Sequence, residues 1–376
     1  NSMVAYCLGI TDVDPIDLDL YFERFINLHR ENPPDFDLDF SWTDRDDITR
    51  YIFSRYGTDR TALLAAYVTF QFKSSIRELG KVMGLPVEEI EALQQATARQ
   101  AYSGLDPVHR AIVKYAGIIH GFPKHLSVHA GGILISERPT HRFSATFVPP
   151  KGYPTVHFDM VTAEDVGLYK FDILSQRGLG HLRDAVDYIY ENRGERVDIH
   201  RIEQFKTDPR LRAELQKGNT IGCFYIESPA MRMLLTKLRT KDYVGLVAAS
   251  SIIRPGVAKS GMMREYILRY RHPELRKNAI PELYAIIPET YGVMVYQEDV
   301  IKVAHRFAGL TLAEADVLRR GMSGKYRSRA EFARVQQKFM ENACELGHSE
   351  ELVNEVWRQI ESFAGYAFSK GHSASY

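Results

Sequence analysis

Residues 34–41, Pro-Asp-Phe-Asp-Leu-Asp-Phe-Ser, form the most informative pattern in the chain. Asp35, Asp37 and Asp39 alternate with apolar residues, and this period of two predicts a strand with all three carboxylates on one face. Carboxylates two residues apart lie about 7 Å apart at the backbone, because each strand residue adds about 3.3 Å. That spacing suits one or two divalent cations, and magnesium prefers such oxygen ligands. A sheet with a solvated acidic face is the alternative for this segment alone.

Two later segments extend the predicted sheet. Residues 168–174 form a strand candidate in which Lys170 and Asp172 share one face. If this strand pairs beside the acidic one, Asp172 reaches the same cation and Lys170 can meet a phosphate. A strand with two ordinary exposed charges is the alternative. Residues 129–136, His-Ala-Gly-Gly-Ile-Leu-Ile-Ser, predict a buried strand entered through a glycine pair.

The composition is that of a globular protein without a large overall charge. The 48 Lys and Arg residues balance the 48 Asp and Glu residues, so any affinity for nucleic acid must come from local basic patches. A length of 376 residues predicts two or three domains. Three scattered cysteines form neither a zinc spacing nor a disulfide framework, and no apolar run is long enough to span a membrane. We therefore expect a cytoplasmic protein without a membrane partner.

Apolar spacing and breakers predict a coarse element order. Residues 3–30 are predicted to be helical with an interruption at a proline, and residues 44–56 form a helix that Gly57 ends. Residues 67–110 are predicted to be mostly helical, and residues 156–160 to form a strand. Helices dominate after residue 178.

Basic residues gather in the second half of the chain. The segment 317–330 holds five cations and no acid, namely Arg319, Arg320, Lys325, Arg327 and Arg329. A helix from near Leu312 is predicted to end at the two adjacent arginines, followed by a flexible glycine loop. Cations placed in this way suit a triphosphate or a nucleic-acid backbone, and a solvated charge run is the alternative.

Smaller features add further candidates for nucleotide and DNA contacts. Arg254 lies in a Pro-Gly turn, and Lys370 and His372 follow an aromatic run, where they can line a nucleotide pocket. A helix cap with satisfied polar groups is the alternative for the last pair. Lys73 and Arg77 lie near the start of an amphipathic helix.

Taken together, the motifs resemble one family, the alpha subunit of bacterial DNA polymerase III, also called the C-family polymerases. They span nearly the whole chain and follow one another in the order of the family. They are residues 34–40 (Pro-Asp-Phe-Asp-Leu-Asp-Phe), 129–132 (His-Ala-Gly-Gly), 170–172 (Lys-Phe-Asp), 222–228 (Gly-Cys-Phe-Tyr-Ile-Glu-Ser), 254–256 (Arg-Pro-Gly), 291–298 (Tyr-Gly-Val-Met-Val-Tyr-Gln-Glu), 318–322 (Leu-Arg-Arg-Gly-Met) and 363–373 (Phe-Ala-Gly-Tyr-Ala-Phe-Ser-Lys-Gly-His-Ser).

The resemblance implies an α+β fold. Its palm has a mixed sheet of the polymerase-beta-like nucleotidyltransferase type, with a helical thumb inserted and a large, mainly helical fingers domain. Mapped onto this chain, the palm covers residues 1–66 and 125–178, the thumb 67–124, and the fingers 179–376, which are incomplete at their C-terminal end.

The resemblance also implies the site residues. Asp37, Asp39 and Asp172 become the catalytic ligands of two magnesium ions, and Asp35 supports them. The implied nucleotide-binding residues are Lys170, Arg254, Arg319, Arg320, Lys370 and His372. The implied DNA-binding residues are Lys73, Arg77, Lys325 and Arg327.

The implied activity is template-directed DNA synthesis by two-metal nucleotidyl transfer from deoxynucleoside triphosphates onto a primer-template. The full-length family members are expected to bind a sliding clamp, a clamp-loader subunit and a proofreading exonuclease. Two family features lie outside this sequence: a Gly-Ser turn that grips the triphosphate just before the position of Asn1, and an N-terminal PHP domain. We therefore expect the isolated chain to have little activity. Both a main replicase and an error-prone paralogue fit the motifs.

Two other classes of protein stay open from the residues alone. A phosphohydrolase with an Asp-x-Asp nucleophile needs a parallel sheet with the acids at the carboxyl end of a strand, and it lacks a long helical insertion between its metal ligands. A non-catalytic DNA-binding module needs the basic patches but not the three acids.

Overall fold

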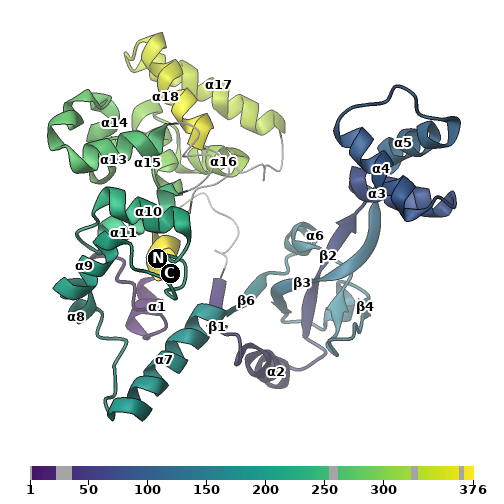
Figure 1. Ribbon diagram of the computed structural model, residues 1–376, viewed down its shortest axis with the longest axis horizontal. Helices are drawn as coiled ribbons and strands as arrows, with labels where there is room; N and C mark the ends of the chain where they lie inside the picture. The colour runs from purple at the N-terminus through teal and green to yellow at the C-terminus, as the bar shows by residue number, and fades with distance from the viewer. Residues whose placement is uncertain (1, 23–35, 254–260, 323–328, 364–367) are drawn as a thin grey trace. The chain divides into compact units, whose positions relative to one another are not determined.

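A computed structural model describes residues 2–22, 36–253, 261–322, 329–363 and 368–376 (Figure 1). The chain divides into two compact units. Residues 35–185 form the first, which we call the sheet unit, and residues 1–34 with 186–376 form the second, the helical unit. The boundaries of palm, thumb and fingers within these units stay predictions.

The sheet unit is built on one mixed sheet of six strands in the order β1-β6-β3-β2-β5-β4. β1 is parallel to β6, β6 is antiparallel to β3, and β3 is antiparallel to β2. The strands are β1 Phe36–Ser41, β2 Thr61–Thr69, β3 Pro123–Ile135, β4 Thr146–Phe147, β5 Thr155–Val156 and β6 Lys170–Gln176. The mixed sheet with many helices agrees with the predicted α+β class.

The alternating sequence of β1 produces the expected two faces. Leu38 and Phe40 pack into a cluster that contains Phe53 from the helix α2 Arg45–Tyr56 and Ile173 from β6. Burying this apolar face against α2 removes it from water and fixes the strand, whose side chains of opposite parity point away from α2. As the sequence predicts, α2 ends at Gly57, which has φ +85°.

The opposite face of the sheet is closed in part by a short helix. Leu64, Leu134 and Val156 pack with Ala163 of α6 Met160–Asp165. By the register of the strands, Asp37 and Asp39 of β1 lie on this same face of the sheet.

The 3₁₀ turn η2 Thr140–Arg142 lies in the connection between β3 and β4.

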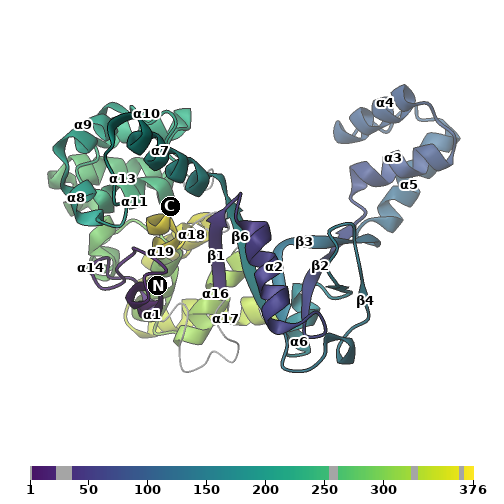
Figure 2. The same cartoon turned by 90° about the horizontal axis from the view of Figure 1, so that it is seen from below.

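A helical segment separates β2 from β3 in the chain. It comprises α3 Phe72–Val82, α4 Val87–Ala98 and α5 Pro107–Ile119, and Figures 1 and 2 show it beyond the ends of the two strands. Its own core contains Ile76, Leu93 and Ile112. Asp106 caps α5 by accepting a hydrogen bond from the backbone N–H of His109 at 2.8 Å.

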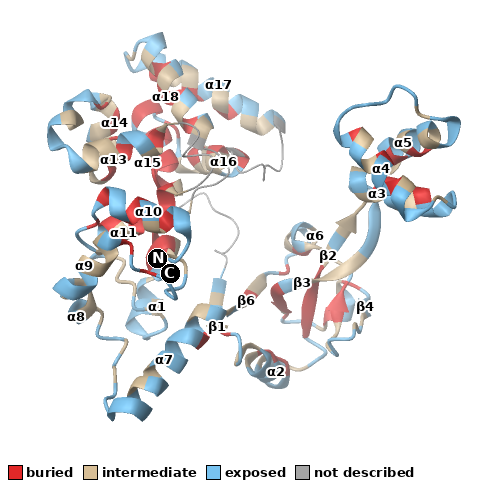
Figure 3. Ribbon diagram, in the orientation of Figure 1, coloured by how far each residue is buried: buried red, intermediate tan, exposed pale blue. Residues whose placement is uncertain are grey.

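The helical unit packs around α15 Gln297–Ala308. Residues from Val300 to Ala308 contribute most of that helix to one large apolar core. Figure 3 shows buried residues on the helices of the helical unit and on the middle strands of the sheet. The helix α7 Arg177–Arg193, whose residues divide between the two units, is mostly exposed. Among the residues that the structure describes, the other helices are α1 Met3–Cys7, α8 Ile202–Thr207, α9 Pro209–Lys217, α10 Pro229–Leu238, α11 Tyr243–Ile252, α13 Met262–Arg271, η3 Pro273–Asn278, α14 Pro281–Ile286, η4 Pro288–Thr290, α16 Leu312–Met322, α17 Arg329–Glu345, α18 Glu350–Phe363 and α19 Lys370–Ser375.

Three predicted elements are wrong in their extent. The first helix stops at Cys7, and Asp14 then accepts hydrogen bonds from the backbone N–H groups of Ile16 and Asp17, which forms a turn where the sequence predicts helix. Residues 23–30 of that prediction lie outside the described residues.

The other two errors concern the ends of strands. Tyr67 belongs to β2, because antiparallel pairing with β3 carries the strand to Thr69 before the helix α3 begins. Met160 begins α6 instead of ending a strand, because the side chain of Asp159 caps that helix by accepting from the N–H of Thr162.

One carboxyl group in the core of the helical unit is fully buried. Asp299, in the first turn of α15, accepts hydrogen bonds through Oδ2 from the N–H groups of Val295 at 2.7 Å and Tyr296 at 2.8 Å. Its Oδ1 has no hydrogen-bond partner among the described residues. Burial, the main cause, raises the pKa of Asp299 from 3.8 to about 7, and the nearby Glu289 adds to this while Lys302 opposes it.

This raised pKa makes stability depend on pH in a stated direction. A carboxyl group with a higher pKa in the folded than in the unfolded state stabilises the fold below its unfolded pKa and loses that effect as the pH rises through the folded value. From about pH 4 to about 7, the free energy of unfolding of the wild type should fall relative to Asp299→Asn, by on the order of 3–4 kcal/mol. Urea unfolding of both proteins across this range measures the difference, and a constant difference would contradict the prediction.

Candidate active site

The pairing of β1 with β6 places the predicted acids on adjacent strands, although among the described residues their carboxylate oxygens do not form a group within 4.8 Å of one another. In the parallel register Asp37 stands opposite Asp172, and Asp39 stands opposite Leu174. Neighbouring strands in a sheet lie about 4.8 Å apart, and side chains of paired residues point to the same face. The three carboxylates therefore share one face over two adjacent strands. Asp37 and Asp39 are exposed, whereas Asp172 is 8% exposed.

The carboxylate of Asp172 has different surroundings at its two oxygens. Lys170, on the same face of β6, donates to Oδ2 from its Nζ in an ion pair. Oδ1 is buried and accepts no hydrogen bond from any described residue, and the nearest ring nitrogen, Nδ1 of His129, lies 3.7 Å away. A buried carboxylate oxygen without a partner is costly, and a divalent cation is one group that satisfies it.

These residues fit the divalent metal that the acidic strand implies. Three carboxylates supply hard oxygen ligands, and the buried Oδ1 of Asp172 lacks a hydrogen bond within the described parts of the chain. Lys170 supplies a positive charge to the same group. The patterns at residues 34–41 and 168–174 indicate the acids, whereas the contribution of His129 to this face has no signal in the sequence beyond its motif.

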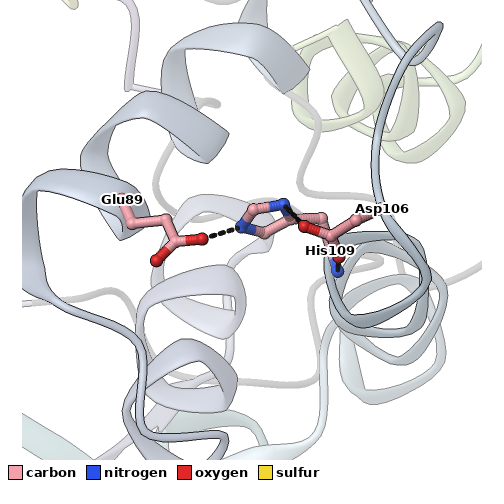
Figure 4. A group of neighbouring side chains, drawn as sticks. All are labelled: Glu89, Asp106 and His109. Carbon is pink, nitrogen blue, oxygen red and sulfur yellow. Dashed lines mark hydrogen bonds and ion pairs between the residues drawn. The ribbon is translucent and has the colours of Figure 1, made fainter.

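A second group of possible metal ligands lies in the helical segment between β2 and β3 (Figure 4). The ring of His109 lies between two carboxylates, with Nδ1 2.7 Å from Oδ2 of Asp106 and Nε2 3.1 Å from Oε1 of Glu89. Both ring nitrogens thus face a carboxylate, so a metal ion would have to displace one of these contacts. We interpret the group as a link between α4, which carries Glu89, and the N-terminus of α5. The sequence analysis did not find it.

The predicted arginines of the helical unit have acidic partners. Arg319 lies 2.7 Å from Oδ1 of Asp316, and Arg320 lies 3.0 Å from its Oδ2. Asp316 directly precedes the segment that the sequence analysis describes as free of acids. Because it lies three and four residues before the arginines on α16, one carboxylate reaches both cations.

The predicted residues near the C-terminal end of the chain lie in the first turn of α19. Lys370 is buried, and its Nζ lies 2.5 Å from Oε2 of Glu289. Ser369 caps the helix by accepting a hydrogen bond from the N–H of His372 at 3.2 Å. The alternative of a helix cap with satisfied polar groups is therefore present in the structure. The ring of His372 contacts Phe368 and Tyr376, at centroid distances of 4.3 Å and 4.6 Å.

The remaining candidates divide into two groups. Lys73 and Arg77 lie one turn apart on α3, and Arg77 is 3.5 Å from Glu78. Asp35, Arg254, Lys325 and Arg327 lie outside the described residues, as do residues 323–326 of the predicted loop. The predicted end of the preceding helix is wrong, because α16 continues past the two arginines through Gly321 to Met322. In the ranges that the structure covers, no helix is both long and apolar enough to cross a lipid bilayer.

Two family models match this chain. The one for the bacterial DNA polymerase III alpha NTPase domain matches residues 1–175, and the one for the bacterial DNA polymerase III alpha subunit finger domain matches residues 178–347.

Curated relatives match along the whole chain. The DNA polymerase III subunit alpha of Aquifex aeolicus is 34% identical over 415 aligned residues, which cover 100% of this chain and 35% of that protein. The error-prone DNA polymerase of Methylococcus capsulatus is 34% identical, and 100% of this chain covers 37% of it. The chain thus spans about a third of the length of these relatives.

The contacts of Asp172 predict how the chain responds to manganese. Mn²⁺ should raise the melting temperature of the chain, since saturation at about 100 times Kd contributes about 2.7 kcal/mol. Asp172→Asn should abolish this rise. Lys170→Met should enlarge the rise in melting temperature, because the positive charge of Lys170 is then gone and the metal ion becomes the main partner of the Asp172 carboxylate.

The control is Lys114→Met, at an exposed lysine of α5. This variant should behave as the wild type in a thermal unfolding series with increasing Mn²⁺. An equal rise for Asp172→Asn and the wild type would show that the metal binds elsewhere.

Proposed function

The chain belongs to the bacterial DNA polymerase III alpha family, and from this premise we propose that it forms the catalytic core of a DNA-directed DNA polymerase. The observation that carries the proposal is the parallel register that sets Asp37 opposite Asp172, whose buried Oδ1 has no hydrogen bond within the described residues. We propose that Asp37, Asp39 and Asp172 hold two magnesium ions and that Asp35 supports them.

Magnesium bound there would lower the pKa of a primer 3′-hydroxyl and neutralise charge on a triphosphate. The chain's own residues orient the reactants. Asp172 on β6 and Asp37 on β1 fix two ligand positions on adjacent strands, whose spacing the backbone hydrogen bonds set. Lys170 stays near a negative charge throughout, because it can exchange the Oδ2 of Asp172 for a phosphate oxygen of the incoming nucleotide.

The other basic residues are proposed to bind substrate charges. Arg254, Arg319, Arg320 and Lys370 would contact the deoxynucleoside triphosphate, and Lys73, Arg77, Lys325 and Arg327 the backbone of the primer-template. Such contacts position the nucleic acid, while base pairing with the template specifies the sequence. To bind phosphate, Arg319 and Arg320 would give up their ion pairs with Asp316. Lys370 would likewise give up its ion pair with Glu289.

In this proposal the sheet is the palm of a polymerase-beta-like nucleotidyltransferase, α3 to α5 form the thumb, and residues 179–376 belong to the fingers. The sliding clamp, the clamp-loader subunit and the proofreading exonuclease are proposed partners of the full-length protein. A main replicase and an error-prone polymerase stay equal candidates, since relatives with both names match the chain at 34% identity.

The structure offers less support to the alternative of a phosphohydrolase with an Asp-x-Asp nucleophile. That class needs a parallel sheet, whereas this sheet is mixed. It also lacks a long helical insertion between its metal ligands, whereas α3, α4 and α5 lie between β1 and β6 in the chain.

Primer extension by the full-length protein tests the proposed roles of the acids. Asp37→Asn, Asp39→Asn and Asp172→Asn should each lower kcat by at least 100-fold, because each removes a charge that holds the metals. The affinity for primer-template DNA should change little. Asp46→Asn, at an exposed acid in the first turn of α2, is the matched control and should keep wild-type activity. Extension at the wild-type rate by any of the three variants would remove that residue from the site.

His372 generates a separate prediction. We propose that its ring packs against the sugar of the incoming nucleotide and excludes a 2′-hydroxyl, the group that distinguishes ribose from deoxyribose. His372→Ala in the full-length protein should then incorporate ribonucleotides more readily, by about 10-fold or more relative to deoxynucleotides. Steady-state incorporation of both nucleotide types measures this ratio. An unchanged ratio with a normal kcat for deoxynucleotides would leave His372 only its contacts with Phe368 and Tyr376.

A further inference from the structure

Strand β3 contains a large bulge beside the acidic face of the sheet. In its antiparallel pairing with β2, Leu63 stands opposite Ile133 and Ala65 stands opposite Val128. The single residue Leu64 of β2 therefore faces the four residues 129–132 of β3. An ordinary β-bulge adds one residue to a strand, and bulges next to active sites commonly change the direction of a side chain.

The side chain of His129 holds this bulge together from inside. Its Nδ1 accepts hydrogen bonds from the N–H of Gly132 at 2.8 Å and from the N–H of Gly131 at 3.3 Å. Residues in a bulge leave the regular ladder, so their N–H groups need other partners. Because Nδ1 accepts here, the ring hydrogen of this tautomer is on Nε2.

A second side chain ties the bulge to β6. Arg45, at the start of α2, donates from Nε to the carbonyl oxygen of Ile173 at 3.1 Å, and from a terminal nitrogen to the carbonyl oxygen of Ala130. One guanidinium group thus joins the bulge to the residue that follows Asp172. Its planar fork suits two acceptors at once.

The glycine pair lets the bulge approach β6 closely. A Cβ atom at Gly131 would lie 2.8 Å from Cδ2 of Leu174 and 3.2 Å from the carbonyl oxygen of Ile173. A Cβ atom at Gly132 would lie 2.9 Å from Nδ1 of His129. Both positions thus need glycine for packing, and this explains the glycine pair in the sequence.

The bulge meets the proposed metal site at Asp172. Gly132, whose N–H donates to His129, is the partner of Asp172 in the pairing of β3 with β6. Nδ1 of His129 lies 3.7 Å from Oδ1 of Asp172, and since that nitrogen accepts from two N–H groups, it does not donate to the carboxylate. Oδ1 consequently receives no hydrogen bond from His129, although the two atoms are close.

We propose that His129 is a positioning residue for the Asp172 carboxylate. By accepting hydrogen bonds from the N–H groups of Gly131 and Gly132, its ring fixes the bulge that aligns Asp172. The Oδ1 atom of Asp172 is then left to bind a divalent cation. This inference rests on the proposed function. His129 itself binds neither metal nor nucleotide in this role.

The test uses primer extension by the full-length protein with His129→Asn, His129→Gln and His129→Ala. The Oδ1 of asparagine takes the place of Nδ1 and can accept the same N–H groups, whereas the glutamine oxygen lies one carbon farther out. His129→Ala and His129→Gln should lower kcat by 10- to 100-fold and raise the Mg²⁺ concentration for half-maximal rate, as outer residues of metal sites commonly do. His129→Asn should stay within about threefold of wild type in both values, and the KM for nucleotide should change little in all three.

The matched control is His125→Ala, at an exposed histidine of the same strand, which should keep wild-type values. If His129→Ala does not fold, the comparison of His129→Asn with His129→Gln decides the question. A folded His129→Gln or His129→Ala with wild-type kcat and Mg²⁺ dependence would overturn the proposal, and so would equal losses in His129→Asn and His129→Gln.

Asp172→Asn distinguishes a failure of the proposed function from a failure of the positioning role. If this variant extends primers normally, the proposed function fails. If it is inactive and the His129 variants are normal, only the positioning role fails.

Discussion

The parallel pairing of β1 with β6 is the constraint on which the proposed site depends. Its register sets Asp37 opposite Asp172 and brings carboxylates from two distant parts of the sequence onto one face. Each strand is held by an apolar residue of opposite parity, since Leu38 and Ile173 pack in the cluster beneath them. A slip of one residue would turn every side chain to the other face and bury the acids, so the hydrophobic face fixes the position of the charges.

Long-range contacts then refine what this pairing establishes. Between β1 and β6 the chain forms β2, three helices and β3, and β3 returns to pair with β6 next to Asp172. The bulge at 129–132 and the guanidinium group of Arg45 act at that junction. The backbone around Asp172 thus has contacts from three elements, β1, β3 and α2. For this reason, changes far from the acids in sequence are expected to act on the same carboxylate.

The sequence predicts the local parts of this arrangement well and the long-range parts poorly. Alternation in residues 36–41 predicts β1 and its acidic face, because parity along a strand is a property of the strand alone. The extension of β2 through Tyr67 and the bulge in β3 depend on pairing between distant strands, which no local pattern encodes. Asp316 lies one residue before the basic segment 317–330, so the composition of that segment does not indicate its ion pairs with the arginines. The family motifs indicated the roles of Asp37, Asp39 and Asp172, and spacing alone did not.

The cations assigned to substrate already have acidic partners, and this shapes how binding would proceed. Lys170 pairs with Asp172, Arg319 with Asp316, and Lys370 with Glu289. A charge removed from water needs a partner, because an isolated buried ion is strongly unfavourable. In the proposed function, substrate phosphates replace these carboxylates, so the gain in free energy is the difference between two ion pairs. At Lys170 this exchange has a further effect, since its departure leaves both oxygens of Asp172 to the metal, and nucleotide binding and metal binding should reinforce each other.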